Sequence, residues 1–340
     1  MSRTVVVAFD KFRGSATSAE LTAAAAAAAR KAGWTPIGVP LADGGEGSLD
    51  VLGGVNKRTT VPGPLGDPVE AGWRLDGRDA FIEMAAASGL VLAGGADGNE
   101  PMLADTTGTG RLIATAIELG ARTVNVLVGG SATTDGGLGA LQAMPPAARL
   151  RGIELVVGCD VETRFVDAAR VFGQQKGATP AQVELLTRRL ELLQDQYLER
   201  YGVDLADVPG AGAAGGLAGG LVAVGARLES GFEMLAERVA LDEHLADADL
   251  VITGEGFLDQ ESFAGKVVGG VHRWAAEAGT PTVAIVGQAD PEATPPDDLE
   301  VRSLTELHGL ERSMEAAIEL VGTEVEQVLA GRPHDDGRPA

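Results

Sequence analysis

The feature that most constrains the fold is an apolar run that leads directly into glycines, VNVLVGGSATTDGGLGA at residues 124–140. The apolar run predicts a buried strand, and the glycines predict a tight turn into a helix. Such a turn can direct backbone N–H groups at an anion such as phosphate. The expected contributors are Gly129, Gly130, Ser131 and Thr133, with Asp135 as a charge that holds a metal ion. The alternative is a purely structural turn that caps the helix.

Length and charge limit the classes of function. A chain of 340 residues predicts one large or two modest α/β domains. Its formal net charge of −22 should repel nucleic acids and anionic membranes, so neither is an expected partner. An anionic substrate therefore needs a local cationic pocket.

Cysteine content and hydropathy indicate the compartment. The single cysteine, Cys159, excludes an intrachain disulfide and a CxxC metal site. The first apolar run, residues 5–9, is too short for a signal peptide, and no segment approaches the roughly 20 apolar residues of a membrane span. We expect a cytoplasmic protein.

Charged side chains follow the first predicted strand. Residues 4–8 are mostly β-branched and lead to Asp10, Lys11 and Arg13, and a helix is expected over residues 18–31 with Ser18 as its N-cap. Open α/β sheets place their sites at the carboxyl ends of strands. These three residues are therefore candidates for binding, with ordinary surface charge as the alternative for Lys11.

A second acidic turn follows the strand expected at residues 37–41. Its sequence ADGGEGS contains Asp43, Gly44, Gly45 and Glu46. Neighbouring carboxylates repel unless they share a cation or a proton, and glycines weaken local packing. The turn is predicted to be part of a site, with a solvated acidic turn as the alternative.

Two later strands also end in acidic residues. The strand at residues 154–158 is followed by Asp160, and the strand at residues 248–253 by Gly254 and Glu255. A helix at residues 267–278 and a strand at residues 282–286 then predict a parallel crossover. Short strands with turn signals at residues 57–84 predict an antiparallel meander.

Several motif tests exclude common enzyme classes. No GxxxxGK[ST] occurs, so a P-loop is not expected. GxGxxG occurs at residues 210–215 without a preceding strand, so a dinucleotide site is not expected. All four histidines lie outside the glycine-rich segments, which argues against a histidine metal centre or a Ser-His-Asp triad.

Lysine usage gives a positive indication. The chain has five lysines, and three of them lie in glycine-rich turns. Because lysine is a mobile point charge suited to phosphate, Lys176 and Lys266 are candidate phosphate contacts, with a solvated surface position as the alternative.

Taken together, these segments resemble the bacterial glycerate kinase family, of the glycerate 2-kinase type. The resemblance covers nearly the whole chain in order. It rests on DKFRGS at residues 10–15, ADGGEGS at 42–48, TGTGR at 107–111, GGSATTDGG at 129–137, FGQQKGA at 172–178, GAGAAGGL at 210–217 and ADLVITGEG at 248–256.

The resemblance implies two α/β domains that enclose a cleft, one flavodoxin-like with a mainly parallel sheet and one with a mixed sheet like that of restriction enzymes. On this basis we expect a first domain over residues 1–100, with residues 312–330 as a candidate segment to complete it. A flavodoxin-like domain would follow over 101–310, with a helical insertion at 161–245, and residues 331–340 would form a disordered tail.

The resemblance also implies transfer of the ATP γ-phosphoryl group to a hydroxyl of D-glycerate, giving 2- or 3-phosphoglycerate. Such transfer needs positioning, charge neutralisation with Mg²⁺, and an acid that accepts the hydroxyl proton. The expected base is Asp43; Asp135 and Glu255 would hold Mg²⁺; Arg13, Lys176 and Lys266 would neutralise carboxylate or phosphates. The chain is expected to be a monomer or homodimer.

Four departures from the family pattern affect substrate recognition. The family usually has lysine at Arg13, asparagine at Thr134 and arginine at Phe257, and a different sequence at residues 162–165. The alternatives are a weak paralogue acting on another hydroxy acid, a sensor that binds such an acid, and a phosphatase. The three acids expected at the site favour an enzyme over a sensor, and the absence of an aspartyl or cysteinyl nucleophile motif argues against a phosphatase.

Overall fold

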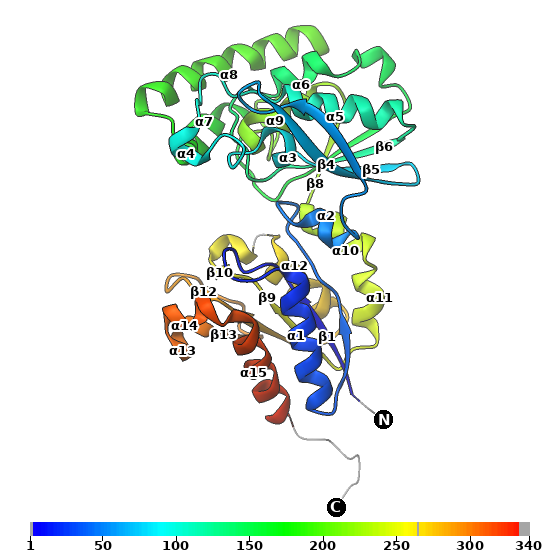
Figure 1. Ribbon diagram of the computed structural model, residues 1–340, viewed down its shortest axis with the longest axis vertical. Helices are drawn as coiled ribbons and strands as arrows, with labels where there is room; N and C mark the ends of the chain where they lie inside the picture. Colours follow the sequence, from blue (N-terminus) through cyan, green and yellow to red (C-terminus); the bar gives the residue numbers. More distant parts are fainter. Residues whose placement is uncertain (1–2, 264, 333–340) are drawn as a thin grey trace, which may run out of the picture. The chain divides into compact units, whose positions relative to one another are not determined.

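The computed structural model describes residues 3–263 and 265–332. Contacts divide the chain into two compact units (Figure 1), each with its own sheet and core. Unit 1 comprises Met1–Asp43 and Phe232–Ala340, and unit 2 comprises Gly44–Gly231. The chain therefore starts in unit 1, builds unit 2 and returns.

The central sheet of unit 1 has five parallel strands in the order β13-β11-β9-β1-β2. Their bounds are β1 Thr4–Phe9, β2 Thr35–Gly38, β9 Leu250–Gly254, β11 Thr282–Val286 and β13 Leu299–Ser303. Read in chain order this is 2-1-3-4-5, the flavodoxin-like doubly wound arrangement. A separate pair, β10 (Phe257–Leu258) and β12 (Gln288–Ala289), lies beyond the ends of β9 and β11.

Helices cover both faces of this sheet because side chains alternate along its strands. On β1, Val5 and Val7 pack with α1 (Ser18–Lys31) and α15 (Ala317–Ala330). Val6 and Ala8 pack against the opposite helical layer. That layer contains α10 (Gly231–Arg238), α11 (Leu241–Ala246) and α12 (Val267–Glu277). The two short helices α13 (Leu304–His308) and α14 (Leu310–Glu315) follow β13.

Helix α1 has the expected bounds but a different N-cap. Thr17 caps it, and Thr17 and Glu20 form a reciprocal capping box. The hydroxyl of Ser18, the expected cap, instead donates to the carbonyl oxygen of Phe9 at 2.7 Å. A glutamate three residues after Thr17 is the signal that favours the earlier position.

Unit 2 contains a mixed six-stranded sheet in the order β3-β4-β5-β6-β7-β8. The strands are β3 Lys57–Pro62, β4 Pro68–Asp76, β5 Asp79–Glu83, β6 Thr123–Leu127, β7 Glu154–Gly158 and β8 Arg227–Glu229. The first three pair antiparallel, as the meander predicted, and β5 to β8 pair parallel.

Helices pack on this sheet in two clusters. The larger core includes Trp73 of β4, Ile82 of β5 and Leu112 of a helix. A second cluster surrounds the fully buried ring of Phe165. The helices of unit 2 are α2 Ser48–Val51, α3 Ala85–Ser88, α4 Gly95–Gly98, α5 Thr107–Glu118, α6 Leu138–Ala143, α7 Ala168–Phe172, α8 Pro180–Tyr201 and α9 Ala213–Ala223. Four 3₁₀ turns occur in the described residues, at Ala147–Arg149, Phe165–Asp167, Gln174–Lys176 and Gln260–Phe263.

The contacts divide the chain at different positions from the expected boundary near residue 100. The meander joins the sheet of unit 2 because β5 pairs in register with β6, from Asp79 with Thr123 to Glu83 with Leu127. The parallel flavodoxin-like sheet is built from the two ends of the chain, with α15 packed beside α1. The expected completion of the first domain by residues 312–330 stays a prediction, and of the tail expected at residues 331–340, residues 333–340 lie outside the described residues.

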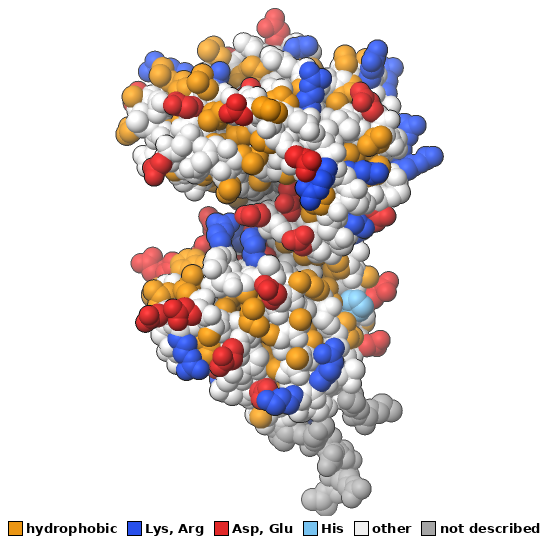
Figure 2. Space-filling view, in the orientation of Figure 1, with side chains coloured by type: hydrophobic (Ala, Val, Ile, Leu, Met, Phe, Trp, Pro, Cys, Tyr) orange, Lys and Arg blue, Asp and Glu red, His pale blue; other side chains and the backbone are white. Residues whose placement is uncertain are grey.

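None of the described helices has the length and hydropathy that a membrane crossing requires. Acidic side chains are spread over both units on the face drawn in Figure 2.

Candidate functional site

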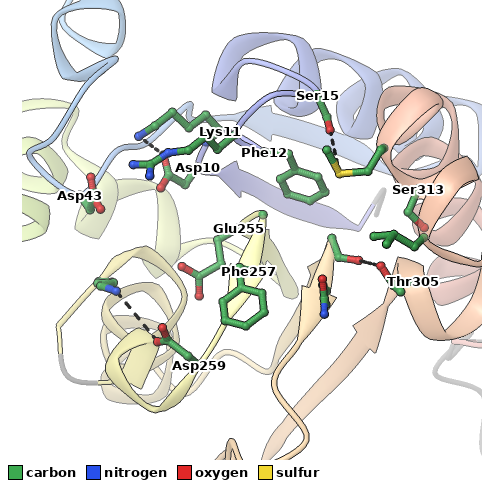
Figure 3. A pocket seen from close by; sticks show the side chains of 17 residues that line it. Asp10, Lys11, Phe12, Ser15, Asp43, Glu255, Phe257, Asp259, Thr305 and Ser313 are labelled. Atoms are coloured by element: carbon green, nitrogen blue, oxygen red, sulfur yellow. Dashed lines mark hydrogen bonds and ion pairs between the residues drawn. The ribbon is translucent and has the colours of Figure 1, made fainter. Parts of the chain in front are cut away.

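Unit 1 contains a cavity of about 370 Å³ at the carboxyl edge of its parallel sheet. Asp10 follows β1, Glu255 follows β9, Gly287 follows β11 and Thr305 follows β13, and all four line it. Because parallel strands end at one edge, residues far apart in sequence converge there. Figure 3 shows Asp10, Asp43 and Glu255 toward one side of this cavity, and Thr305 and Ser313 toward the other.

The cavity lies at the point where the strand order reverses. The chain runs from β1 to β2 on one side and places β9 on the other side of β1. Asp10 and Glu255 directly follow Phe9 and Gly254, which pair in register. Ligands of doubly wound sheets bind at this switch point. In the sequence, Asp10 and Glu255 were selected because each is an acid that follows a predicted strand. In the structure, these two strands are adjacent.

The carboxyl group of Asp10 is buried and electrostatically crowded. Burial raises its pKa to about 6; Lys11 opposes that shift, and the Asp43 carboxylate adds to it. One oxygen accepts the backbone N–H of Lys11 at 2.7 Å. Asp43, the expected base, thus lies within electrostatic range of Asp10 and lines the same cavity.

Glu255 is the more strongly perturbed acid. Burial raises its pKa to about 8, the Ser262 hydroxyl and Lys266 oppose the shift, and Asp10 and Asp259 add to it. Its Oε1 atom is buried and accepts no hydrogen bond from the residues that the structure describes. A buried acceptor without a donor is costly, so this atom is available to a cation or a ligand proton.

Three of the expected cations line the same cavity: Lys11, Arg13 and Lys266. The Nζ atom of Lys11 lies 3.8 Å from Asp10 Oδ1. Lys266 Nζ lies 3.3 Å from Glu261 and 4.0 Å from Asp259. Burial alone would lower the pKa of Lys266, but these carboxylates outweigh it and the pKa is raised. The cavity therefore offers three cationic side chains to an anionic substrate, beside the carboxylates of Asp10, Asp43, Glu255 and Asp259.

Close packing explains why three of the expected site residues, Gly44, Gly129 and Gly254, are glycines. A Cβ on Gly44 would lie 2.7 Å from Gly231 Cα, and Gly44 has a φ of +82°. A Cβ on Gly129 would lie 2.8 Å from Gly45 Cα. Gly254 is similarly required, because its Cβ would lie 1.9 Å from the carbonyl oxygen of Ile285. Glu46 is exposed in unit 2.

In unit 2, the anion at the glycine-rich turn is the chain's own Asp135. Its Oδ2 accepts hydrogen bonds from the Thr106 hydroxyl at 2.7 Å, Thr106 N at 3.0 Å and Gly139 N at 3.0 Å, and its Oδ1 accepts from Gly137 N at 3.1 Å. The donors to this buried carboxylate, Thr106, Gly137 and Gly139, differ from the residues expected to face a phosphate, for which the anion contact stays a prediction. Four accepted hydrogen bonds make Asp135 a brace between the starts of α5 and α6, and its expected role in holding a metal ion stays a prediction.

Lys176 is buried behind the same turn. Its Nζ donates to the carbonyl oxygen of Thr133 at 2.7 Å, and burial lowers its pKa to about 7 against the opposing charge of Asp135. The Thr133 hydroxyl lies 3.5 Å from the carbonyl oxygen of Ala214, and Ser131 forms a bridge with Gly89. Among the described residues these contacts hold loops of unit 2 together. The expected phosphate contact by Lys176 stays a prediction that this packing does not favour.

Asp160 also has a structural partner, since one of its oxygens accepts the N–H of Gly231 at 2.8 Å. The carbonyl oxygen of Gly130 likewise accepts the N–H of Leu90 at 2.8 Å.

Of the departures from the family pattern, Phe165 is a core residue of unit 2 and Phe257 is half-exposed in the cavity of unit 1. The buried Thr134 hydroxyl has no hydrogen-bond partner among the described residues.

Sequence reasoning missed the wall of the cavity formed by α13 and α14, which includes Thr305, Leu310, Ser313 and Met314. These residues are not flanked by a motif, and they reach the site only because β13 pairs with β11. Asp259 also lines the cavity, and the sequence analysis assigns it no role. The described residues contain no group of three or more acids, histidines or cysteines arranged to hold a metal ion.

A model described as the glycerate kinase family matches residues 5–148 and 145–331. A protein of Escherichia coli K12 named glycerate 2-kinase is 39% identical over 289 residues, which cover 74% of this chain and 76% of that protein. A glycerate kinase of Halalkalibacterium halodurans is 38% identical over 329 residues, 84% of this chain and 85% of that one.

The fold also matches a solved structure. A putative glycerate kinase 2 from Salmonella typhimurium LT2 superimposes with a TM-score of 0.80 at 33% identity, over 97% of this chain and 98% of that chain. The similarity to this solved structure therefore covers the residues of both units.

Proposed function

Because the chain belongs to the glycerate kinase family, we propose that it transfers the γ-phosphoryl group of ATP to the 2-hydroxyl of D-glycerate in the unit 1 cavity. Family membership implies a kinase that phosphorylates glycerate and uses ATP as the phosphate donor. The 2-hydroxyl is proposed because the E. coli relative is named a 2-kinase. The observation that carries the location is that the cations and acids of this cavity meet at the switch point of the sheet.

The cations of the cavity are suited to two anions. Arg13 presents a planar guanidinium, which recognises a carboxylate with two parallel hydrogen bonds. Lys266 presents a point charge at the start of α12, where it can exchange its two carboxylate partners for phosphate oxygens. We assign the carboxylate of glycerate to Arg13 and the phosphates to Lys266, with Lys11 adding charge beside Asp10.

The donor set fits Mg²⁺. Glu255 offers a buried oxygen that accepts no hydrogen bond from the described residues, and Asp10 lies on the adjacent strand. Mg²⁺ in kinases uses one or two carboxylates together with phosphates and water. We therefore assign Glu255 and Asp10 as its protein ligands, and assign Asp135 a structural task on the basis of its four accepted hydrogen bonds. When bound, the ion would neutralise phosphate charge.

Asp43 remains the proposed general base. It lines the cavity at the end of unit 1's first segment, on the same side as Asp10. A base accepts the proton of the attacking hydroxyl, so it must be ionised before transfer.

The test measures ADP release from ATP with and without D-glycerate, with enolase as the reporter of product. Enolase converts 2-phosphoglycerate to phosphoenolpyruvate and does not act on 3-phosphoglycerate. We expect ADP only when glycerate is present, together with an immediate enolase signal. ADP without an enolase signal would overturn the 2-hydroxyl assignment alone. The absence of glycerate-dependent ADP would overturn the activity.

A further inference from the structure

The cavity of unit 1 has an apolar half that its charged residues do not explain. Phe257 is 49% exposed, Leu310 56% and Met314 49%, and all three line the cavity together with the buried ring of Phe12. Exposed large apolar side chains that converge on one cavity indicate a bound ligand rather than scattered surface residues. They come from β10 and α14, two elements that are brought to this cavity from different parts of the chain.

The hydroxyls of this half are already used. Thr305 donates to the carbonyl oxygen of Gly287 at 2.8 Å, and Ser313 donates to that of Gly309 at 2.7 Å. The Gln288 side chain is exposed at the cavity, and its amide both donates and accepts hydrogen bonds. The apolar half therefore suits a flat ring with a donor and acceptor edge, and offers little to a small polyol acid.

The volume of the cavity also favours a ligand larger than a three-carbon acid. A volume of about 370 Å³ falls in the range of sites for drug-sized ligands, roughly 300–1,000 Å³, and exceeds the needs of a three-carbon acid. A nucleotide joins a flat ring to an anionic tail, and this cavity joins an apolar wall to Lys11, Arg13 and Lys266.

We propose that Phe257, Leu310 and Met314 bind the base of the phosphoryl donor, with the base stacked on the Phe257 ring and its edge at Gln288. The inference rests on the proposed kinase function and adds the location of the base. It also assigns a role to Phe257, which occupies a position where the family usually has arginine. At this position the aromatic ring provides a stacking surface instead of a positive charge.

The test compares ADP with pyrophosphate, which carries phosphates without a base, by calorimetry on the full chain in the presence of Mg²⁺. Phe257→Ala should weaken ADP binding roughly ten-fold, the order expected for loss of one base–aromatic stack, and leave pyrophosphate binding unchanged. Phe257→Trp should retain ADP binding. Leu307→Ala is the matched control, since Leu307 is 50% exposed on α13 and does not line the cavity.

Three outcomes would overturn the proposal: unchanged ADP affinity in Phe257→Ala, an equal loss for ADP and pyrophosphate, or an effect confined to the KM for glycerate. The last would assign the apolar half to the acceptor. The proposed function fails separately, because a protein that binds ADP as described but releases no glycerate-dependent ADP would contradict the activity and leave the base site standing.

Discussion

Asp10 and Glu255 are neighbours across two parallel strands, each directly following one of the paired residues Phe9 and Gly254. Their side chains are buried, with pKa values raised to about 6 and about 8. Between these values the pair carries one proton in the absence of a cation. We therefore expect the protonation of this pair to respond both to pH and to a bound cation.

The first prediction concerns pH and stability. The pKa of Glu255 is raised from 4.5 to about 8, so the folded state binds this proton more tightly than the unfolded state. The resulting stabilisation is fully present below about pH 4.5 and is lost as the pH rises through 8. Without metal, the wild type should lose stability relative to Glu255→Gln between pH 5 and pH 8, by a few kcal/mol at about 1.4 kcal/mol per pKa unit.

Urea unfolding at pH 5, 6.5 and 8 measures this difference. Mg²⁺ at pH 8 should restore stability to the wild type and have little effect on Glu255→Gln, because the ion favours the ionised carboxylate. Parallel pH profiles for the two proteins would mean that Glu255 titrates normally. A similar response of both proteins to Mg²⁺ would remove Glu255 from the metal site.

The second prediction concerns Asp43. Asp43→Asn removes the proposed base and should lower kcat by about 10²- to 10⁴-fold, the usual contribution of general base catalysis, with the fold intact. Asp50→Asn is the control, because Asp50 is an exposed acid nearby in the sequence, outside the cavity. The ADP-release assay gives kcat for both variants. If Asp43→Asn retains the wild-type kcat, the proton must leave by another group.

The sequence predicted the acids of the cavity because of a general property of parallel sheets. Asp10 and Glu255 each follow a short apolar strand, and strand ends of this kind meet at one edge. The same reasoning also selected Asp160 and Asp135, which accept backbone hydrogen bonds inside unit 2. A residue after a strand is recognisable from sequence, but whether its oxygens face a cavity or a neighbouring N–H depends on packing.

The division of the chain was less accessible to sequence analysis. The expected boundary after residue 100 lies next to a short helix, α4, and the segments on both sides of it belong to unit 2. Which sheet β5 joins depends on its parallel pairing with β6, about 40 residues later. The apolar wall at Leu310 and Met314 was missed for the same reason, since only the pairing of β13 with β11 brings it to the site.

The third prediction separates structural from metal-binding roles for Asp135. Asp135→Asn replaces an oxygen by an NH₂ group among N–H donors, so it should cost about 2–4 kcal/mol of stability and leave Mg²⁺ and ADP affinity unchanged. Asp105→Asn is the control, since Asp105 accepts one hydrogen bond, from Thr107 N at 2.8 Å, and its loss should cost less. Chemical denaturation and calorimetry give the two readouts. A lower Mg²⁺ affinity with unchanged stability would restore Asp135 as a ligand.

The last prediction tests why the acidic turn contains glycine. Gly44 and Gly33 have nearly equal φ values, +82° and +84°, so alanine at either position pays the left-handed backbone cost of about 1–2 kcal/mol. A Cβ on Gly33 meets nothing within 4 Å, whereas one on Gly44 would lie 2.7 Å from the backbone of Gly231. Gly44→Ala should therefore lose about 1–3 kcal/mol more than Gly33→Ala in urea unfolding, the range for overpacking. Equal losses would mean that the segment at Gly231 moves aside at no cost, and the glycine would then be required for its φ alone.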